Sequence, residues 1–103
     1  MHMPLKPPIL LVWYKRDLRV RDHRPLSEAL ALGRERAIPI LTIYSFEPRV
    51  IEAPDFSDFH RQFIIDSLID LSSSLERLGI PLHIFERNIS EVIKYILTHY
   101  RIE

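Results

Sequence analysis

Short apolar runs alternate along this chain with stretches in which apolar residues recur every three or four positions. Apolar residues are unbroken over 9–14, and further mostly apolar runs cover 37–46 and 80–85. Runs of this length, rich in Ile, Val and aromatic residues, are typical of strands covered on both faces, as in parallel sheets. The intervening periodicity indicates amphipathic helices. The chain is therefore predicted to be an α/β domain of three layers with the order βαβαβα, its parallel sheet lying between helices.

The first two predicted helices end at the two glycines of the chain. The first helix is expected over about 23–32, with Asp22 as its N-cap and Gly33 as its stop. The second and longest is expected over 56–78, with Gly79 as its stop. Its predicted apolar face consists of Phe56, Phe59, Phe63, Ile64, Leu68, Leu71, Leu75 and Leu78. We expect this face to make the main stabilising contact with the sheet.

The last part of the chain is predicted to form a third helix. Asn88 and Glu91 have the spacing of a capping box, in which each side chain bonds the other residue's backbone N–H. Residues 101–103 are interpreted as the beginning of a fourth strand that the chain does not complete. A truncated domain with three visible strands and later strands missing is therefore expected. Its open sheet edge favours self-association.

Composition excludes several classes of function. The 103 residues include 14 basic and 14 acidic ones, and a net charge of zero argues against binding nucleic acid through the overall field. The absence of cysteine excludes disulfides, thiolate nucleophiles and cysteine-ligated metals. With both glycines assigned to helix ends, neither a GxGxxG motif nor a P-loop can follow the first strand, and the five histidines lack metal-ligand spacing. The first apolar run is too short for a signal peptide or a membrane span, so a cytoplasmic location is predicted.

The charged loop 15–22 after the first strand is the strongest candidate site. In open parallel sheets, ligands bind beyond the carboxyl ends of the strands. The loop could therefore hold an anionic ligand through its lysine and arginines, with Asp17 or Asp22 orienting them. The alternative is structural, because charges of both signs packed this closely often pair with each other and shape the loop. Both interpretations stay open, also for different residues of the same loop.

The end of the second strand is expected at the same edge of the sheet as Lys15. Tyr44, Phe46 and Glu47 could then form one wall of a shared cleft, with aromatic faces for a flat ligand and a carboxylate for its polar end. The alternative is that Phe46 simply packs under the following loop. No serine, histidine or carboxylate elsewhere forms a convincing catalytic set for an enzyme acting alone.

Several segments together resemble one protein family. Residues 11–23, LVWYKRDLRVRDH, are similar to the opening motif of the DNA photolyase and cryptochrome family, which reads L-V-W-F-(R/K)-x-D-L-R followed by D-(N/H)-x-x-L. Residues 38–48 resemble its second strand, 60–71 its long helix and 78–82 the turn into its third strand. The resemblance covers nearly the whole chain, and it departs at Phe59, where many members carry arginine.

The resemblance implies the N-terminal Rossmann-like α/β domain of this family, or part of it, which houses or borders an antenna chromophore, a folate or a deazaflavin. It implies that Lys15, Arg16 and Asp17, and by position Phe46 and Glu47, line the antenna site. In the parent protein, a deoxyribodipyrimidine photolyase or a blue-light receptor, FAD lies in a separate helical domain downstream. That domain would bind damaged DNA, and the present chain would not be catalytic alone. A free-standing Rossmann-like module that binds a nucleotide or a protein partner is the alternative.

Overall fold

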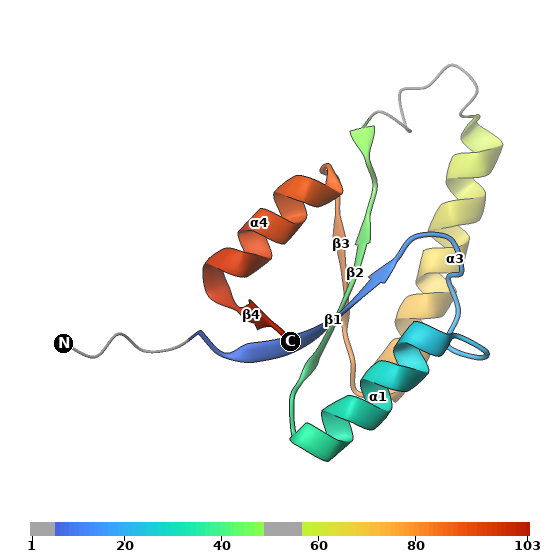
Figure 1. Ribbon diagram of the computed structural model, residues 1–103. Coiled ribbons are helices and arrows are strands. Elements are labelled where there is room, and N and C mark those ends of the chain that lie inside the picture. Colours follow the sequence, from blue (N-terminus) through green and yellow to red (C-terminus); the bar gives the residue numbers. More distant parts are fainter. Residues whose placement is uncertain (1–5, 49–56) are drawn as a thin grey trace.

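Parallel strands with helices on both sides make up the computed structural model of the protein, which describes residues 6–48 and 57–103 (Figure 1). The elements in chain order are β1 (Pro8–Tyr14), α1 (Arg24–Arg36), β2 (Ile40–Ser45), α3 (Asp58–Arg77), β3 (Leu82–Phe85), α4 (Ile89–His99) and β4 (Arg101–Ile102). The strands are parallel and lie in the order β3-β2-β1-β4. The predicted α/β class with a parallel sheet is confirmed.

The sheet has one strand more than the three predicted. Arg101 and Ile102 form β4, which pairs with Pro8 and Ile9 at the start of β1. The backbone N–H of Arg101 donates to Pro7 at 2.9 Å, and that of Glu103 donates to Ile9 at 3.0 Å. Residues 101–103 therefore do more than begin an unpaired strand, because two backbone hydrogen bonds already fix them beside β1.

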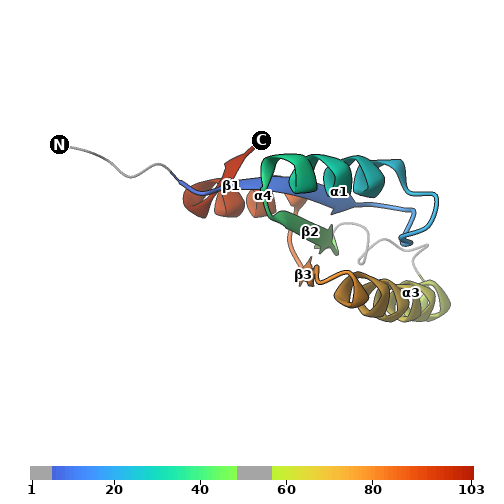
Figure 2. The same cartoon turned by 90° about the horizontal axis from the view of Figure 1, so that it is seen from below.

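The two faces of the sheet carry separate hydrophobic cores, because side chains alternate along each strand. On one face, Val12, Tyr14 and Tyr44 pack against residues of α1 and α3. On the other face, Ile9 and Ile43 pack against α4. Figure 1 shows α4 on one side of the strands and α1 and α3 on the other, and Figure 2 shows α1 beside β1 and α3 beside β3. The sheet is thus the middle of three layers, as predicted.

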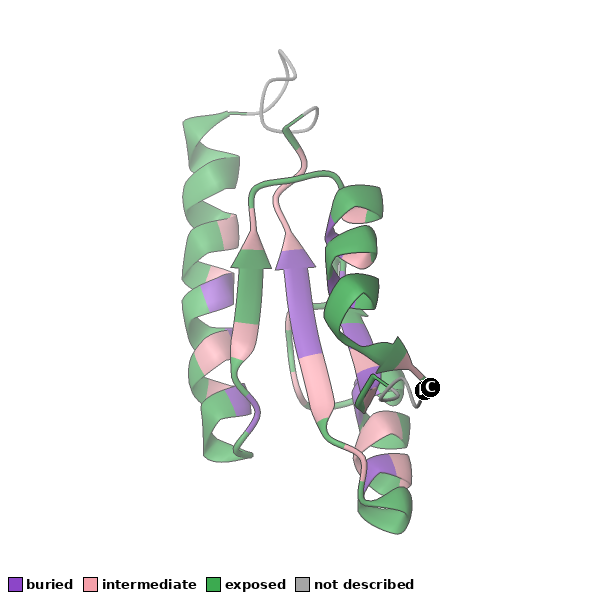
Figure 3. Ribbon diagram, turned by 90° about the vertical axis from the view of Figure 1, so that its left-hand side faces the viewer, coloured by how far each residue is buried: buried purple, intermediate pink, exposed green. Residues whose placement is uncertain are grey.

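Helix α3 buries only part of the predicted apolar face. Leu68, Leu71 and Leu75 are buried, and Figure 3 shows the buried positions of this helix gathered away from its first turns. Phe59 and Phe63 are 79% and 65% exposed. Phe59 precedes Leu68 by nine positions, about two and a half helical turns, which puts the two on opposite sides of the helix. The prediction of one continuous face is therefore wrong for Phe59 and Phe63 and for Leu78, which is 49% exposed at the end of the helix, and Phe56 lies outside the described residues.

Two predicted helix ends also differ from the structure. Helix α1 passes through Gly33 and ends at Arg36, and Ala37 takes the left-handed conformation at its end with φ of 55°. Gly33 is needed for close packing, since a Cβ there would lie 2.9 Å from the Ile38 carbonyl oxygen. Gly79 does follow α3 with φ of 76°, as a stop residue should. Asn88 makes no side-chain hydrogen bond to the backbone of α4, so the predicted capping box is wrong.

Candidate functional site

A cavity lies at the carboxyl end of β1, where the charged loop 15–22 leaves the sheet. It has a volume of about 440 Å³ and is lined by Trp13, Lys15, Arg16, Asp17 and His23. Strand β1 pairs with β2 on one side and with β4 on the other, so the strand order changes direction at β1. Open α/β sheets bind ligands at such switch points, in cavities of about this size. The structure thus brings the three loop residues of the predicted site together.

Trp13 gives this cavity an aromatic wall beside a positive charge. The Trp13 side chain is 41% exposed, although it belongs to a strand. The Lys15 ammonium nitrogen lies 5.5 Å from the centroid of the indole ring, which is within cation–π distance. A flat anionic or electron-rich ligand could contact both groups. The apolar pattern alone does not single out Trp13, but an aromatic residue two positions before the charged loop is a signal that would have found it.

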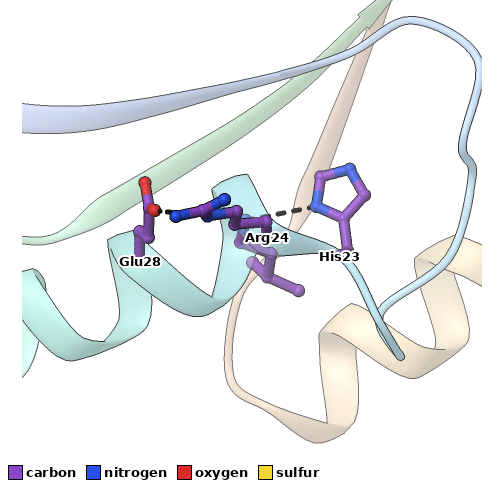
Figure 4. A network of polar contacts seen from close by, with 4 residues as sticks. His23, Arg24 and Glu28 are labelled. Carbon is purple, nitrogen blue, oxygen red and sulfur yellow. Dashed lines mark hydrogen bonds and ion pairs between the residues drawn. The ribbon is translucent and has the colours of Figure 1, made fainter.

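His23 is held tightly between the start of α1 and the end of β1. Its Nδ1 accepts a hydrogen bond of 3.1 Å from the backbone N–H of Leu26 (Figure 4). Its ring stacks on the Tyr14 ring, with 4.6 Å between the centroids and 28° between the planes. Because Nδ1 accepts a hydrogen bond, neutral His23 carries its proton on Nε2.

The helix cap is therefore His23 and not Asp22. His23 has the extended backbone conformation of an N-cap, with φ of −115° and ψ of 98°. Asp22 has a positive φ of 49°, which belongs to the turn before the helix. The prediction of Asp22 as the cap is wrong by one residue. The physical reason is that the Nδ1 atom of an imidazole can accept the hydrogen bond from the first-turn N–H, here that of Leu26, as well as a short carboxylate can.

Burial keeps His23 neutral. Desolvation lowers the pKa of its imidazole below the ordinary value, and the positive charge of Arg19 acts in the same direction. The Asp17 carboxylate opposes this shift and raises the pKa. Since an unperturbed histidine titrates near pH 6.5 and the net shift is downward, His23 is uncharged at neutral pH. The cavity therefore contains one neutral imidazole among charged side chains.

Tyr14, beneath His23, is fully buried. Its hydroxyl is the one buried side-chain polar atom without a hydrogen-bond partner among the described residues. Burial raises the pKa of Tyr14 to about 12. The ring thus supports His23 by stacking, while the hydroxyl adds an energetic cost to the core.

Backbone hydrogen bonds, and not ion pairs, shape the charged loop. The N–H of Leu18 donates to the carbonyl of Arg16 at 3.0 Å, and the N–H of Arg19 donates to that of Asp17 at 2.9 Å. The Arg19 guanidinium donates to the Asp22 carbonyl at 3.4 Å. Within residues 6–48 and 57–103, the ion pairs lie elsewhere, and none joins two residues of this loop. The alternative of an internal salt-bridge network is therefore wrong for the described loop.

The residues at the end of β2 do not line this cavity. Phe46 contacts Tyr44 edge to face, with 5.0 Å between ring centroids, and packs against the core. It lines a second cavity of about 340 Å³ with residues of α3 and β3, whereas Glu47 lines neither cavity. The structure thus agrees with the packing alternative for Phe46. A role of Phe46 and Glu47 in ligand binding stays a prediction.

The part of the chain that the structure describes contains neither a candidate metal site nor a candidate membrane span. No group of three or more His, Cys, Asp or Glu residues there could hold a metal ion. No helix there is long and apolar enough to cross a membrane.

Fold and cavity together define an α/β domain with a ligand-sized cavity at the switch point of a parallel sheet. The sequence profile of the DNA photolyase family matches residues 10–103. This match covers most of the chain, and the chain therefore belongs to the DNA photolyase family. The family resemblance of the sequence motifs is confirmed.

The relatives include both cryptochromes and photolyases. A cryptochrome DASH of Gloeobacter violaceus is 34% identical over 98 residues, which cover 90% of this chain and 19% of the relative. A deoxyribodipyrimidine photo-lyase of Neurospora crassa is 36% identical over 70 residues, or 68% of this chain and 11% of the relative. A (6-4)DNA photolyase of Arabidopsis thaliana is 31% identical over 103 residues, or 90% of this chain and 18% of the relative. The chain thus spans less than a fifth of the length of each of these relatives.

Proposed function

We propose that this chain forms an antenna-chromophore-binding α/β domain of a photolyase or cryptochrome and has no catalytic activity of its own. The observation that carries the proposal is the cavity at the carboxyl end of β1, lined by Trp13 and by Lys15, Arg16 and Asp17. Its place at the switch point of the sheet is where this class of fold binds ligands. A folate or a deazaflavin has the flat ring system that such a cavity accommodates.

Each lining residue has a distinct role in this proposal. The Trp13 indole contacts the face of the ligand ring, and Lys15 and Arg16 attract its negatively charged part. Asp17 accepts a hydrogen bond from a ring N–H. Phe46 and Glu47 leave the same edge of the sheet at the end of β2, and we propose that they meet only a ligand that extends beyond the cavity.

The remaining functions are proposed for a longer parent protein. There, a downstream helical domain binds FAD and damaged DNA, and light drives the repair of pyrimidine dimers or a blue-light signal. A cytoplasmic location also stays a prediction. Self-association is proposed along β1, because β4 pairs only with Pro8 and Ile9 and the rest of that side of β1 has no strand beside it in the described residues.

The chain contains a single tryptophan, and that tryptophan lines the cavity, so its fluorescence reports directly on binding. Purified protein is titrated with folic acid, 5-deazariboflavin and ATP, and N-acetyltryptophanamide is titrated in parallel to correct for absorption and collisional quenching. We expect saturable quenching by folic acid or 5-deazariboflavin. Arg16→Ala should weaken this binding roughly tenfold, as expected for a lost charged hydrogen bond. Lys94→Ala, at an exposed position of α4, should leave it unchanged.

The titration also tests the alternative of a nucleotide-binding module. Saturable quenching by ATP alone would support that module and contradict the antenna proposal. The structure disfavours this outcome, because Gly33 lies within α1 and Gly79 follows α3, so neither belongs to the loop after β1. Absence of saturable quenching by any of the three ligands would contradict both functions.

A further inference from the structure

The two ring nitrogens of His23 have different surroundings. Nδ1 is occupied by the hydrogen bond from the N–H of Leu26, and Figure 4 shows the other nitrogen, Nε2, pointing away from α1. Nε2 has no hydrogen-bond partner among the described residues, and it is not among the fully buried atoms that lack one. His23 is one of the residues that line the cavity, so Nε2 is the ring nitrogen that remains for a ligand bound there. His23 thus offers the cavity one N–H donor, Nε2–H. The proton is on Nε2 because Nδ1 accepts the hydrogen bond from Leu26.

This donor is also fixed in position before any ligand arrives. The His23 residue is only 8% exposed, its ring stacks on Tyr14, and its Nδ1 is tied to the first turn of α1. A group held in this way loses little conformational entropy when it binds a ligand. The exposed Lys15 and Arg16 have long flexible side chains and lack this advantage.

We infer that His23 is a ligand-binding residue of this cavity and donates its Nε2–H to a carbonyl oxygen or ring nitrogen of the bound heteroaromatic ring. The inference rests on the proposed function, because it names the group that meets the ring in the same cavity. His23 supplies a neutral donor, whereas Lys15 and Arg16 supply charged ones. His23 donates a hydrogen bond to the uncharged edge of the ring, and Lys15 and Arg16 bind the anionic part of the ligand.

Two substitutions separate binding from helix capping. In His23→Asn, the amide oxygen takes the place of Nδ1 and keeps the cap, but no donor reaches the position of Nε2. In His23→Gln, the longer side chain brings an amide N–H near the position of Nε2 but does not keep the cap. Both variants and the wild type are titrated with folic acid and 5-deazariboflavin by Trp13 fluorescence. Their stabilities are measured by urea unfolding.

If His23 only caps the helix, ligand affinity should not change in His23→Asn, which keeps the cap. If His23 binds the ligand, affinity should fall in His23→Asn although its stability does not. His23→Asn should fold as stably as the wild type and bind roughly three- to tenfold more weakly, whereas His23→Gln should be less stable and bind more tightly than His23→Asn. If His23→Asn binds as tightly as the wild type, the inference is wrong while the proposed function stands. If the wild type binds neither ligand, the proposed function fails and the inference fails with it. If His23→Gln does not fold, His23→Asn alone decides.

Discussion

The chain leaves the same edge of the sheet at the ends of β1 and β2, and the two exits are built differently. After β1, the exposed Lys15, Arg16 and Asp17 surround a cavity. After β2, Phe46 turns back onto Tyr44, and its backbone N–H donates to the carbonyl of Phe85 at 2.6 Å. The strands β1, β2 and β3 follow one another in one direction, whereas β4 lies on the far side of β1. The cavity lined by the charged loop lies at the exit beside the change of direction, and the residues after β2 do not line it, so being at the carboxyl edge of the sheet does not by itself make a residue part of this site.

Both exits rest on the same core, and its removal should give the largest effect. Leu71 of α3 is 2% exposed and belongs to the core cluster that includes Tyr14 and Tyr44. Leu71→Ala should lower the free energy of unfolding by about 2–5 kcal/mol, because it leaves a cavity in this core. Phe63→Ala is the matched control on the exposed side of α3 and should change it by less than about 0.5 kcal/mol. Urea unfolding followed by circular dichroism measures both, and equal losses would contradict the described orientation of α3.

A pair of aromatic substitutions tests the difference between the exits directly. Phe46→Ala should lower the free energy of unfolding by about 1–3 kcal/mol, since the half-buried ring packs on the core, and should leave the affinity for a small heteroaromatic ligand unchanged. Trp13→Ala should cost a similar amount, about 1–3 kcal/mol, since more than half of this side chain is buried, but it should also weaken ligand binding, here followed by the absorption of the ligand. If Phe46→Ala is fully folded under the assay conditions and still binds the ligand more weakly, Phe46 belongs to the ligand site.

The sequence predicted the β1 exit better than the β2 exit for a physical reason. A buried strand followed by dense charge can only place Lys15, Arg16 and Asp17 at the surface, so their grouping followed from the chain itself. Phe46 is one apolar residue after a strand. Whether it faces a ligand or the core depends on the packing of α3 and β3, which are distant from it in sequence. Likewise, the cap by His23 depends on the turn at Asp22, whose positive φ no local pattern indicates. The same holds for α3. Apolar residues spaced by three or four positions predict a helix, but in a long helix this spacing does not tell which of them face the sheet.

The pH dependence of stability should distinguish the β1 exit from the rest of the molecule. Burial lowers the pKa of His23 in the folded state, so below the pKa of the unfolded chain, near 6.5, the unfolded state binds more protons. The stabilisation by His23 is therefore complete above that pH and is lost as the pH falls through the lower folded pKa. The loss should be about 1–2 kcal/mol, the contribution of a helix cap, because protonated Nδ1 no longer accepts the Leu26 N–H.

The matched control for this prediction is His23→Asn, which keeps a cap that does not titrate. Urea unfolding at several pH values from 8 to about 5 should show the wild type losing stability relative to this variant. The facing charges of Asp17 and Arg19 act on the imidazole in opposite directions, so Asp17→Asn should move the loss to lower pH. Parallel pH curves for wild type and His23→Asn would show that the imidazole does not cap α1.

The smallest expected effect is a gain in stability, and it tests whether the β1 exit is supported by the Tyr14 ring or by its hydroxyl. Tyr14→Phe removes a buried hydroxyl that has no partner among the described residues and keeps the ring that stacks on His23. It should raise the free energy of unfolding by about 1 kcal/mol, with unchanged ligand affinity.

Because burial raises the pKa of Tyr14 to about 12, the wild type should also lose stability as the pH rises above about 10, where the unfolded tyrosine ionises first. Tyr14→Phe should lack this part of the alkaline loss, and a variant that is instead destabilised would show that the hydroxyl has a partner in solution and contributes to holding His23 at the cavity.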